Sequence, residues 1–377
     1  MPQLIIHTAI DEIEASAWNR LITDGDPFLH HAFLAALERH HCVGDQFGWH
    51  PCHLAYYESG ALVAALPLYA KDNSYGELVF DHVWAQAYER HGLRYFPKLV
   101  SAIPYTPATG RRLLCQAGDE AHYWPLLATA AQQLAREQGM SGWHCLFPTA
   151  TEANALSERG LLLRHDCQFH WHNRDYADFS AFLAALSSKK RKNILRERRR
   201  VTAAGITFRH LNGHQASALD WHHFARFYRN TFAEKWGVAT FNEGFFREVA
   251  ATLPDQILLI LADDREGQPI AGALCYRSET TLYGRHWGCD EKLPDLHFET
   301  CYYQGIEYAI THQLQRFEPG AQGEHKLARG FLPTVTRSIH ALIDSPLQPA
   351  IADFVARERR GIADYIEHLE ASTPYAK

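Results

Sequence analysis

The sequence has eight cysteines but no Cys-x-x-Cys pair, so it lacks the ligand spacing of a structural zinc site. A chain of 377 residues also does not need disulfide bonds to stabilise a small core. No apolar run approaches the length of about 20 residues that spans a bilayer. The first residues, MPQLIIHTAIDEIEAS, have no basic segment before their apolar stretch, unlike a signal peptide. These absences predict a cytoplasmic protein with reduced thiols, no metal and no membrane span.

Three common catalytic motifs are also missing. The sequence has no Gly-x-Ser-x-Gly elbow, no phosphate-binding P-loop and no Gly-x-Gly-x-x-Gly fingerprint. The formal net charge of −6 gives no overall basic field that would attract nucleic acid. Any site for an anion must therefore be a local patch.

The composition, with 46% hydrophobic and 21% charged residues, is that of a soluble globular protein. At this length two domains are expected. We place them at residues 1–173 and 174–377. A hairpin pattern, strand then polar turn with Gly then small-residue strand, occurs in LAYYESGALVAALPLY (54–69) and again in LILADDREGQPIAGALCY (259–276). This repetition suggests two copies of one α/β module.

Periodicity and turn residues predict a mixed α/β fold in both halves. The expected helices are 11–22, 28–40, 81–91, 120–138, 152–159, 179–204, 216–232, 243–253, 298–313 and 346–369. The expected strands are 53–57, 61–69, 95–103, 143–147, 161–172, 206–211, 256–262, 269–276, 281–287, 315–318 and 335–343.

A basic helix is expected at residues 187–203, where eight Lys and Arg residues are accompanied by one acid, Glu197. Lys189, Lys192 and Arg196 recur at three- and four-residue spacings and therefore share a face. Such a face suits phosphates, because arginine forms bidentate contacts and lysine supplies a point charge. Nucleic acid, a phosphorylated cofactor or an anionic precursor would each fit. The alternative is an ordinary solvated helix face.

Most of the chemically useful side chains lie between residues 282 and 333. Glu318 ends a short predicted strand, and His325 and Lys326 follow in a loop with several glycines. A carboxylate or imidazole base beside cationic partners is what acyl transfer to an amine requires. Tyr302, in the preceding helix, could protonate a leaving group. A structural polar turn, or a thiol nucleophile at Cys301, are the alternatives.

Five long segments carry a family resemblance. They are SYGELVFDHVWAQAYERHGLRYFPKL (74–99), IPYTPATGRRLL (103–114), FHWHNRDYADFSAFLAALSSKKRKNILRERR (169–199), LYGRHWGCDEKLPDLHFETCYYQGIEYAI (282–310) and EPGAQGEHKLARGFLP (318–333). They resemble a Fem-like bacterial family of predicted N-acyltransferases, often described as peptidoglycan biosynthesis or recognition proteins. The resemblance implies two tandem acetyltransferase-like domains. It also implies transfer of an aminoacyl group from tRNA to an amine of a peptidoglycan precursor.

The resemblance implies a site where strands 281–287 and 315–318 separate to admit the acyl chain. From the residue pattern itself, we expect Glu318 or His325 to act there as the general base and Tyr302 to assist the leaving group. Charge would be stabilised by Arg285 and Lys326. The other expected substrate-binding residues are Trp287, Glu299 and Tyr303, and Lys189, Lys192 and Arg196 of the basic helix.

One loop departs from ordinary acetyl-CoA transferases. They carry a glycine-rich loop whose N–H groups hold the pyrophosphate of CoA, whereas the corresponding CDEKLPDLHFE (289–299) has four acids and no glycine. Acidic side chains at a helix N-terminus repel a phosphate. We therefore do not expect CoA in the usual position, and PYTPATGRR (104–112) is a candidate second anion contact.

Three functions follow from these observations. The first is N-acyl transfer by direct attack of an amine, with an aminoacyl-tRNA or acyl-CoA as co-substrate. The second is a non-catalytic protein that binds a peptidoglycan-like or tRNA-like ligand. The third is a CoA-dependent small-molecule acetyltransferase.

Overall fold

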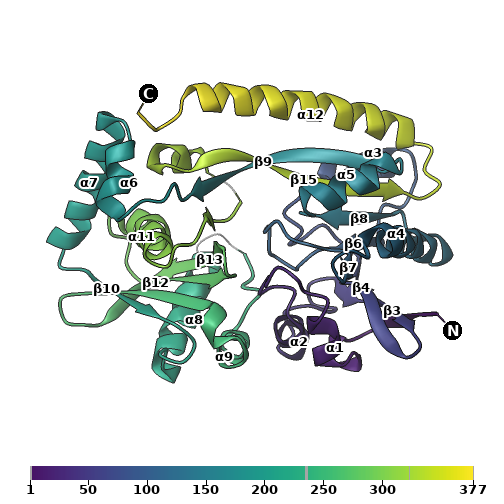
Figure 1. Cartoon of the computed structure of the whole chain (residues 1–377), viewed down its shortest axis with the longest axis horizontal. Helices are drawn as coiled ribbons and strands as arrows, with labels where there is room; N and C mark the ends of the chain where they lie inside the picture. Colours follow the sequence, from purple (N-terminus) through teal and green to yellow (C-terminus); the bar gives the residue numbers. More distant parts are fainter. Residues whose placement is uncertain (1, 234–236, 322, 377) are drawn as a thin grey trace. The chain divides into compact units, whose positions relative to one another are not determined.

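The computed structural model describes residues 2–233, 237–321 and 323–376. It divides into two compact units, one of residues 1–167 with 335–365 and the other of residues 168–334 with 366–377. This differs from a single cut after residue 173, because the chain returns to the first unit near its end (Figure 1). The reason is strand pairing: β15 (Leu332–Leu342) lies antiparallel to β8 (Gly142–Leu146) over Ser338 to Leu342.

The first unit contains two groups of paired strands. One has the order β1-β3-β4-β7, and the other runs β15-β8-β6-β5-β2. The strands not yet defined are β1 (Gln3–His7), β2 (Trp49–Pro51), β3 (His53–Glu58), β4 (Ala61–Leu66), β5 (Tyr69–Lys71), β6 (Lys98–Ser101) and β7 (Leu114–Cys115). The helices are α1 (Ala15–Asn19), α2 (His31–Arg39), α3 (His82–Arg90), α4 (Glu120–Glu137), α5 (Ala150–Glu158) and most of α12 (Gln348–Ala371).

The segment between β6 and β7 is almost entirely buried, and its arginines are occupied. Arg112 is 0% exposed, and its Nε donates to the carbonyl oxygen of Leu146 at 3.0 Å. A second guanidinium nitrogen donates to the carbonyl oxygen of Ala108 at 2.8 Å. Arg111 donates to the carbonyl oxygen of Cys115 at 3.2 Å. The expectation that residues 104–112 form an anion contact is therefore wrong, because backbone carbonyl groups take up these donors.

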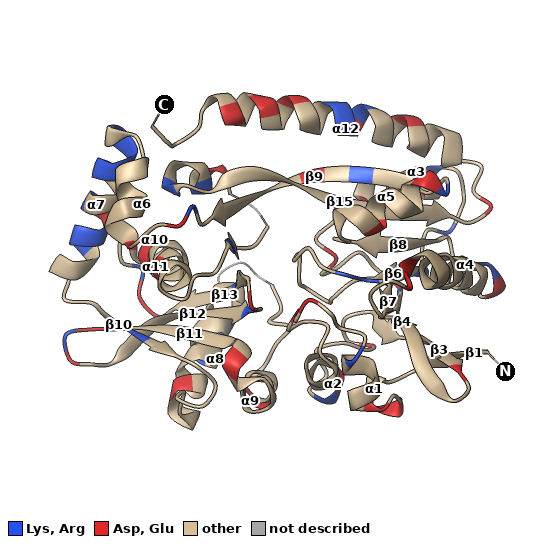
Figure 2. Cartoon of the chain, viewed as in Figure 1, with Lys and Arg blue, Asp and Glu red and all other residues tan. Residues whose placement is uncertain are grey.

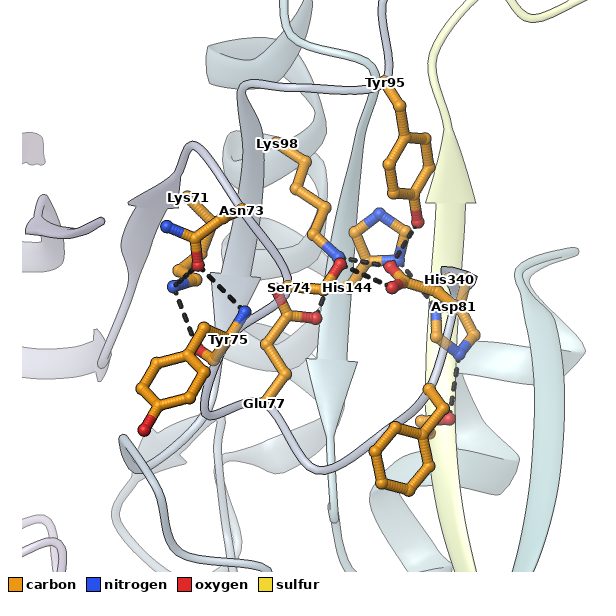
Figure 3. A network of polar contacts seen from close by, with 12 residues as sticks. Lys71, Asn73, Ser74, Tyr75, Glu77, Asp81, Tyr95, Lys98, His144 and His340 are labelled. Atoms are coloured by element: carbon orange, nitrogen blue, oxygen red, sulfur yellow. Dashed lines mark hydrogen bonds and ion pairs between the residues drawn. The ribbon is translucent and has the colours of Figure 1, made fainter. Parts of the chain in front are cut away.

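A buried charged cluster fastens the loop that follows β5 in the first unit (Figure 3). Lys98 is 0% exposed and forms ion pairs with Asp81 and with Glu77, whose Oε2 lies 2.8 Å from Nζ. Tyr95 donates to Asp81 at 2.5 Å and Ser74 donates at 2.6 Å. Burial raises the pKa of Glu77 to about 7, although Lys98 opposes this. Burial also disfavours the charge on Asp81, but Lys98 and the nearby hydrogen bonds keep its pKa below the ordinary value.

The second unit has strands in the order β10-β11-β12-β13-β14-β9. They are β9 (Leu162–His172), β10 (Thr207–Leu211), β11 (Ile257–Asp263), β12 (Pro269–Arg277), β13 (Thr281–Cys289) and β14 (Arg316–Glu318). Pairing is antiparallel throughout except between β13 and β14, which are parallel. The two predicted hairpins are confirmed as β3–β4 in the first unit and β11–β12 in the second.

The helices of the second unit show three differences from the predicted elements. The expected helix 179–204 is divided into α6 (Phe179–Ala185) and α7 (Ser188–Ala203), because Leu186 is extended. The expected helix 298–313 begins as α10 (Leu296–Phe298), passes through the π-helical segment η3 (Glu299–Tyr303) and ends as α11 (Gln304–Thr311). The expected loop after β14 contains a 3₁₀ helix, η4 (Glu324–Arg329). The remaining helices are α8 (Ala218–Ala233) and α9 (Glu243–Thr252).

Among the described residues, every helix is too short or too polar to cross a bilayer.

Candidate functional site

Strand β13 contains a bulge at Arg285. Along its pairing with β12, His286 lies opposite Leu274 and Gly284 lies opposite Cys275, so Arg285 is the additional residue. A bulge of this kind redirects a side chain and often occurs beside a functional site. Burial lowers the pKa of Arg285 to about 10, and the negative charge of Glu318 is among the influences that oppose this decrease.

Glu318 lies at the end of β14 and is 3% exposed. Its Oε1 is 2.9 Å from Nε of Arg316 and 4.0 Å from Nδ1 of His170. His170 was not among the residues selected from the sequence. Its Nε2 lies 3.1 Å from Oε1 of Gln168, and burial lowers its pKa to about 3, so the ring is neutral. Only its place near the end of a predicted strand could have pointed to it.

Lys326 belongs to the same group of charges. It is 2% exposed, and its Nζ donates to the carbonyl oxygen of Gly320 at 2.8 Å. Burial lowers the pKa of Lys326 to about 8, and the positive charge of Arg285 contributes to the decrease. The fold thus brings Arg285, Glu318 and Lys326 together where β14 ends and β13 continues.

The π-helical segment η3 points its side chains toward different partners. Such segments are rare and are frequent at functional sites. Glu299, 3% exposed, accepts from Nε of Arg198 at 3.1 Å and from Gln304 at 2.8 Å. The hydroxyl of Tyr303 donates to Glu197. Both of these predicted substrate-binding residues are therefore bonded to α7.

Tyr302, between them, forms a different pair. Its hydroxyl lies 2.9 Å from Nε2 of His325 in η4. Burial raises the pKa of Tyr302, so its hydroxyl stays protonated. His325 is exposed, but partial burial and the cations Arg329 and Lys326 lower its pKa. A neutral imidazole that solvent can reach is thus hydrogen-bonded to a phenol.

Gly323 permits the position of the His325 ring. Its φ of +123° is rarely adopted by residues with a side chain, and a Cβ placed there would lie 2.4 Å from Cε1 of His325. Glycine avoids both the backbone strain and this overlap. The glycine-rich character of the loop therefore has a direct structural role.

Trp287 lies on β13 beyond the bulge and is half-buried. Its ring makes an edge-to-face contact with His297 at a centroid distance of 5.2 Å. It also packs against the apolar cluster that includes Val201 and Leu296. Its role in lining an acyl or peptide site stays a prediction.

Helix α7 is rich in Lys and Arg (Figure 2), and these residues form two groups that differ in their partners. Lys189, Lys192 and Arg196 are exposed, and their side chains make no hydrogen bond or ion pair within the part of the chain that the structure describes. In contrast, Arg198 pairs with Glu299 and with Glu307. The three predicted anion-binding residues are therefore available to a ligand.

The geometry offers little support for a cysteine nucleophile or for a metal site. Burial raises the pKa of Cys301 well above its ordinary value, so the thiol is not readily ionised as a nucleophile needs to be. Within residues 2–233, 237–321 and 323–376, no three His, Cys, Asp or Glu side chains are grouped so that they could hold a metal ion.

Comparison with known proteins supports the fold. A model of the FemAB-like family, described as peptidoglycan biosynthesis/recognition, matches residues 9–377. FemX is similar in structure, with a TM-score of 0.53 and 11% identity over 93% of this chain and 100% of that chain. The C-terminal domain of a putative lysylphosphatidylglycerol synthetase from Agrobacterium fabrum has a TM-score of 0.55 and 10% identity, over 93% of this chain and 96% of that chain.

A search of the curated proteins finds no match to the sequence. The structural similarity confirms the predicted tandem acetyltransferase-like α/β fold. The family match extends over nearly the whole chain and includes all five segments that carried the resemblance. The chain belongs to the FemAB-like family of peptidoglycan biosynthesis/recognition proteins.

Proposed function

We propose that this acyltransferase of the FemAB-like family transfers an acyl or aminoacyl group to an amine of a peptidoglycan precursor. The amine attacks the acyl carbonyl directly, without a covalent enzyme intermediate. The hydrogen bond between Tyr302 and His325 carries this proposal. It provides a base and an acid that are already connected.

The pair suits a proton relay from the amine to the leaving group. As the amine nitrogen bonds to the carbonyl carbon, Nδ1 of His325 takes the amine proton. The proton on Nε2 passes to the hydroxyl oxygen of Tyr302, and the hydroxyl proton goes to the departing oxygen or sulfur. Each group ends the step neutral, with His325 in its other tautomer, and proton exchange with solvent at the exposed ring restores the starting tautomer. His325 is the better base on accessibility, because Glu318 is almost fully buried and paired with Arg316.

The nearby charges suit the negative oxygen of the tetrahedral intermediate. Lys326 and Arg285 are cations in a buried environment, where an ammonium or guanidinium group stabilises developing negative charge more strongly than in water. The negative charge of Glu318 acts on Arg285 in the resting enzyme. In this proposal it is a counter-charge rather than the base.

The acidic loop favours a donor other than CoA bound in the usual way. Asp290 forms an ion pair of 2.6 Å with Arg226, and Asp295 forms one of 3.1 Å with Arg200. These arginines are consequently not free to bind a pyrophosphate. An aminoacyl ester, as in an aminoacyl-tRNA, is the donor class that we propose.

Turnover with a panel of donors and acceptors tests the proposal. Charged tRNA and acetyl-CoA would be offered with a lysine-containing muropeptide, and the acylated product measured by mass spectrometry. With the donor that supports turnover, we expect His325→Gln to lower kcat by about 10²- to 10⁴-fold, the usual contribution of a general base, with binding little changed. Tyr302→Phe should also reduce kcat.

His368→Gln is the matched control, because His368 is exposed on α12. It should retain wild-type turnover. Full activity of His325→Gln would remove the proposed base. Binding of the muropeptide without turnover for any donor would favour a non-catalytic recognition protein.

A further inference from the structure

We propose that the outer face of α7, with an apolar pocket at its C-terminal end, binds the surface of an anionic phospholipid bilayer. This interaction surface consists of Lys189, Lys192, Arg196 and Arg199 with the pocket beside Arg200. It does not depend on acyl transfer, so it can hold or fail independently of the proposed function.

The four cations form one stripe. Their spacing of three, four and three residues places them on the same side of the helix. They extend over about 15 Å, at 1.5 Å per residue. All four are exposed, and none of their side chains contacts a hydrogen-bonding or acidic partner among the described residues. Figure 2 shows that α7 carries Lys and Arg, in blue, along its length.

The acids near α7 do not neutralise this stripe. Arg198 forms an ion pair with Glu307 at 2.8 Å, and Arg200 forms one with Asp295 at 3.1 Å. Glu197, the one acid of the helix, is bonded to Tyr303 and Arg329. Four like charges therefore remain unopposed in a protein of net charge −6. An ordinary solvated helix face has acids interspersed with its bases, and this face has none.

An apolar pocket lies at the C-terminal end of α7, next to the basic stripe. It has a volume of about 170 Å³, and its lining residues are mostly aliphatic. They are Arg200, Val201, Ala204, Ile206, Leu293, Pro294 and Leu296. Arg200 is thus both part of the basic helix and part of the pocket wall. Because Arg200 is paired with Asp295, hydrocarbon in this pocket would place a neighbouring phosphate toward the unpaired cations Arg196 and Arg199 of the same helix.

The lining of the pocket favours lipid over nucleic acid. Proteins that bind single-stranded RNA usually stack its bases on aromatic rings, but no aromatic side chain lines this pocket. Hydrocarbon needs only aliphatic walls that exclude water. Basic side chains near an anionic leaflet are attracted to it individually, and their contributions add.

Vesicle co-sedimentation of the full chain tests the proposal. The probes are vesicles of phosphatidylcholine alone and vesicles of equal parts phosphatidylcholine and phosphatidylglycerol. We expect binding only to the second kind. Binding should weaken as salt shortens the Debye length from about 10 Å at 0.1 M to about 3 Å at 1 M. Lys192→Ala with Arg196→Ala should reduce partitioning by about 30-fold, because two surface cations are lost.

Arg359→Ala with Arg360→Ala is the matched control, since both residues are exposed on α12 and the same charge is removed. It should leave partitioning close to wild type. A second variant, Ala204→Leu, reduces the space in the pocket without changing charge, and we expect several-fold weaker binding to the anionic vesicles.

Three outcomes would overturn the proposal. They are equal binding to both kinds of vesicle, an equal loss in the α12 control, and binding of polyuridylate RNA that depends on Lys192 and Arg196 without any binding of anionic vesicles. The last result would assign the stripe to nucleic acid. Turnover in solution can be measured on Ala204→Leu, which changes no residue of the candidate site, so loss of lipid binding with full kcat in that variant would leave the proposed acyl transfer intact.

Discussion

Arg329 in η4 forms an ion pair with Glu197 in α7, with distances of 3.0 and 3.1 Å from one guanidinium nitrogen to the two carboxylate oxygens. The other terminal nitrogen of Arg329 donates to the carbonyl oxygen of His325 at 2.8 Å. Glu197 also accepts a hydrogen bond from Tyr303. The basic helix is thereby connected to both segments that carry the candidate acid and base.

Replacing Glu197 with Gln should weaken this connection. Arg329 is 7% exposed and would lose the charge that compensates it. Removing one partner of a buried charged hydrogen bond costs about 2 kcal/mol, so the free energy of unfolding in denaturant titrations should fall by that amount. Glu367→Gln, at an exposed site on α12, should change it by less than about 0.5 kcal/mol. Equal stability of the two variants would contradict the connection.

The dependence of kcat on pH should have two limbs. His325 must be neutral to take a proton, and its pKa is lowered, so activity should fall only as pH decreases below the ordinary histidine value of about 6.5. Lys326 must be charged to stabilise the oxyanion, and its pKa is about 8, so activity should fall as pH rises through that value.

Lys326→Arg separates these two contributions. An arginine stays protonated throughout the accessible range, so the decrease at high pH should disappear while the limb at low pH remains. Both proteins would be assayed with the same donor and acceptor across the pH range. An unchanged decrease near pH 8 in the variant would show that another group titrates there.

Gly323→Ala should affect activity more than stability. The new Cβ would overlap the His325 ring, which is the end of a mobile side chain and would move away from Tyr302. We expect at least a tenfold loss of kcat. The positive φ should cost about 1 kcal/mol of unfolding free energy. Gly118→Ala is the control, because Gly118 has a φ of +98° with open space around it, so it shares the strain but should keep full kcat.

Local patterns predicted much of the fold. The hairpins β3–β4 and β11–β12 were predicted because alternating strands joined by a short turn need only neighbouring residues. The pairing of β15 with β8 was not predicted, because its partner lies almost two hundred residues away. Nothing within residues 335–343 indicates which strand they join, and so the return of the chain to the first unit was missed.

In the candidate site, too, contacts between residues far apart in the sequence were not predicted. The residue pattern indicated Glu318 and Lys326, the expected mechanism added Arg285, and the fold brings their charges together. The partners of Glu299 and Tyr303 were not foreseen, since Arg198 and Glu197 lie about a hundred residues earlier on the basic helix. That helix was interpreted through its exposed cations alone. Its inner face instead supports η3, which no spacing rule relates to α7.

The buried cluster around Lys98 predicts a specific dependence of stability on pH. The folded pKa of Glu77 is about 7, above the ordinary value of 4.5. Between these values the folded protein retains a proton that the unfolded chain has released. The stability contributed by Glu77 is therefore complete below about pH 4.5 and is lost as pH rises through about 7, with a slope of about 1.4 kcal/mol per pH unit. Asp81 has a lowered pKa in the folded protein, so its contribution to stability has the opposite pH dependence. That contribution is complete above the ordinary pKa of an aspartate and is lost as pH falls below it.

Glu77→Gln should remove this contribution, because the amide does not titrate and keeps a similar shape. Denaturant titrations at pH 5, 6, 7 and 8 should give the difference in unfolding free energy between wild type and the variant. We expect this difference to decrease as pH rises and to become constant above about pH 7. Glu89→Gln, on the exposed side of α3, should keep the slope of wild type. If Glu77→Gln also kept that slope, the proton held by the folded protein would have to reside elsewhere, and Glu77 would be an ordinary ionised partner of Lys98.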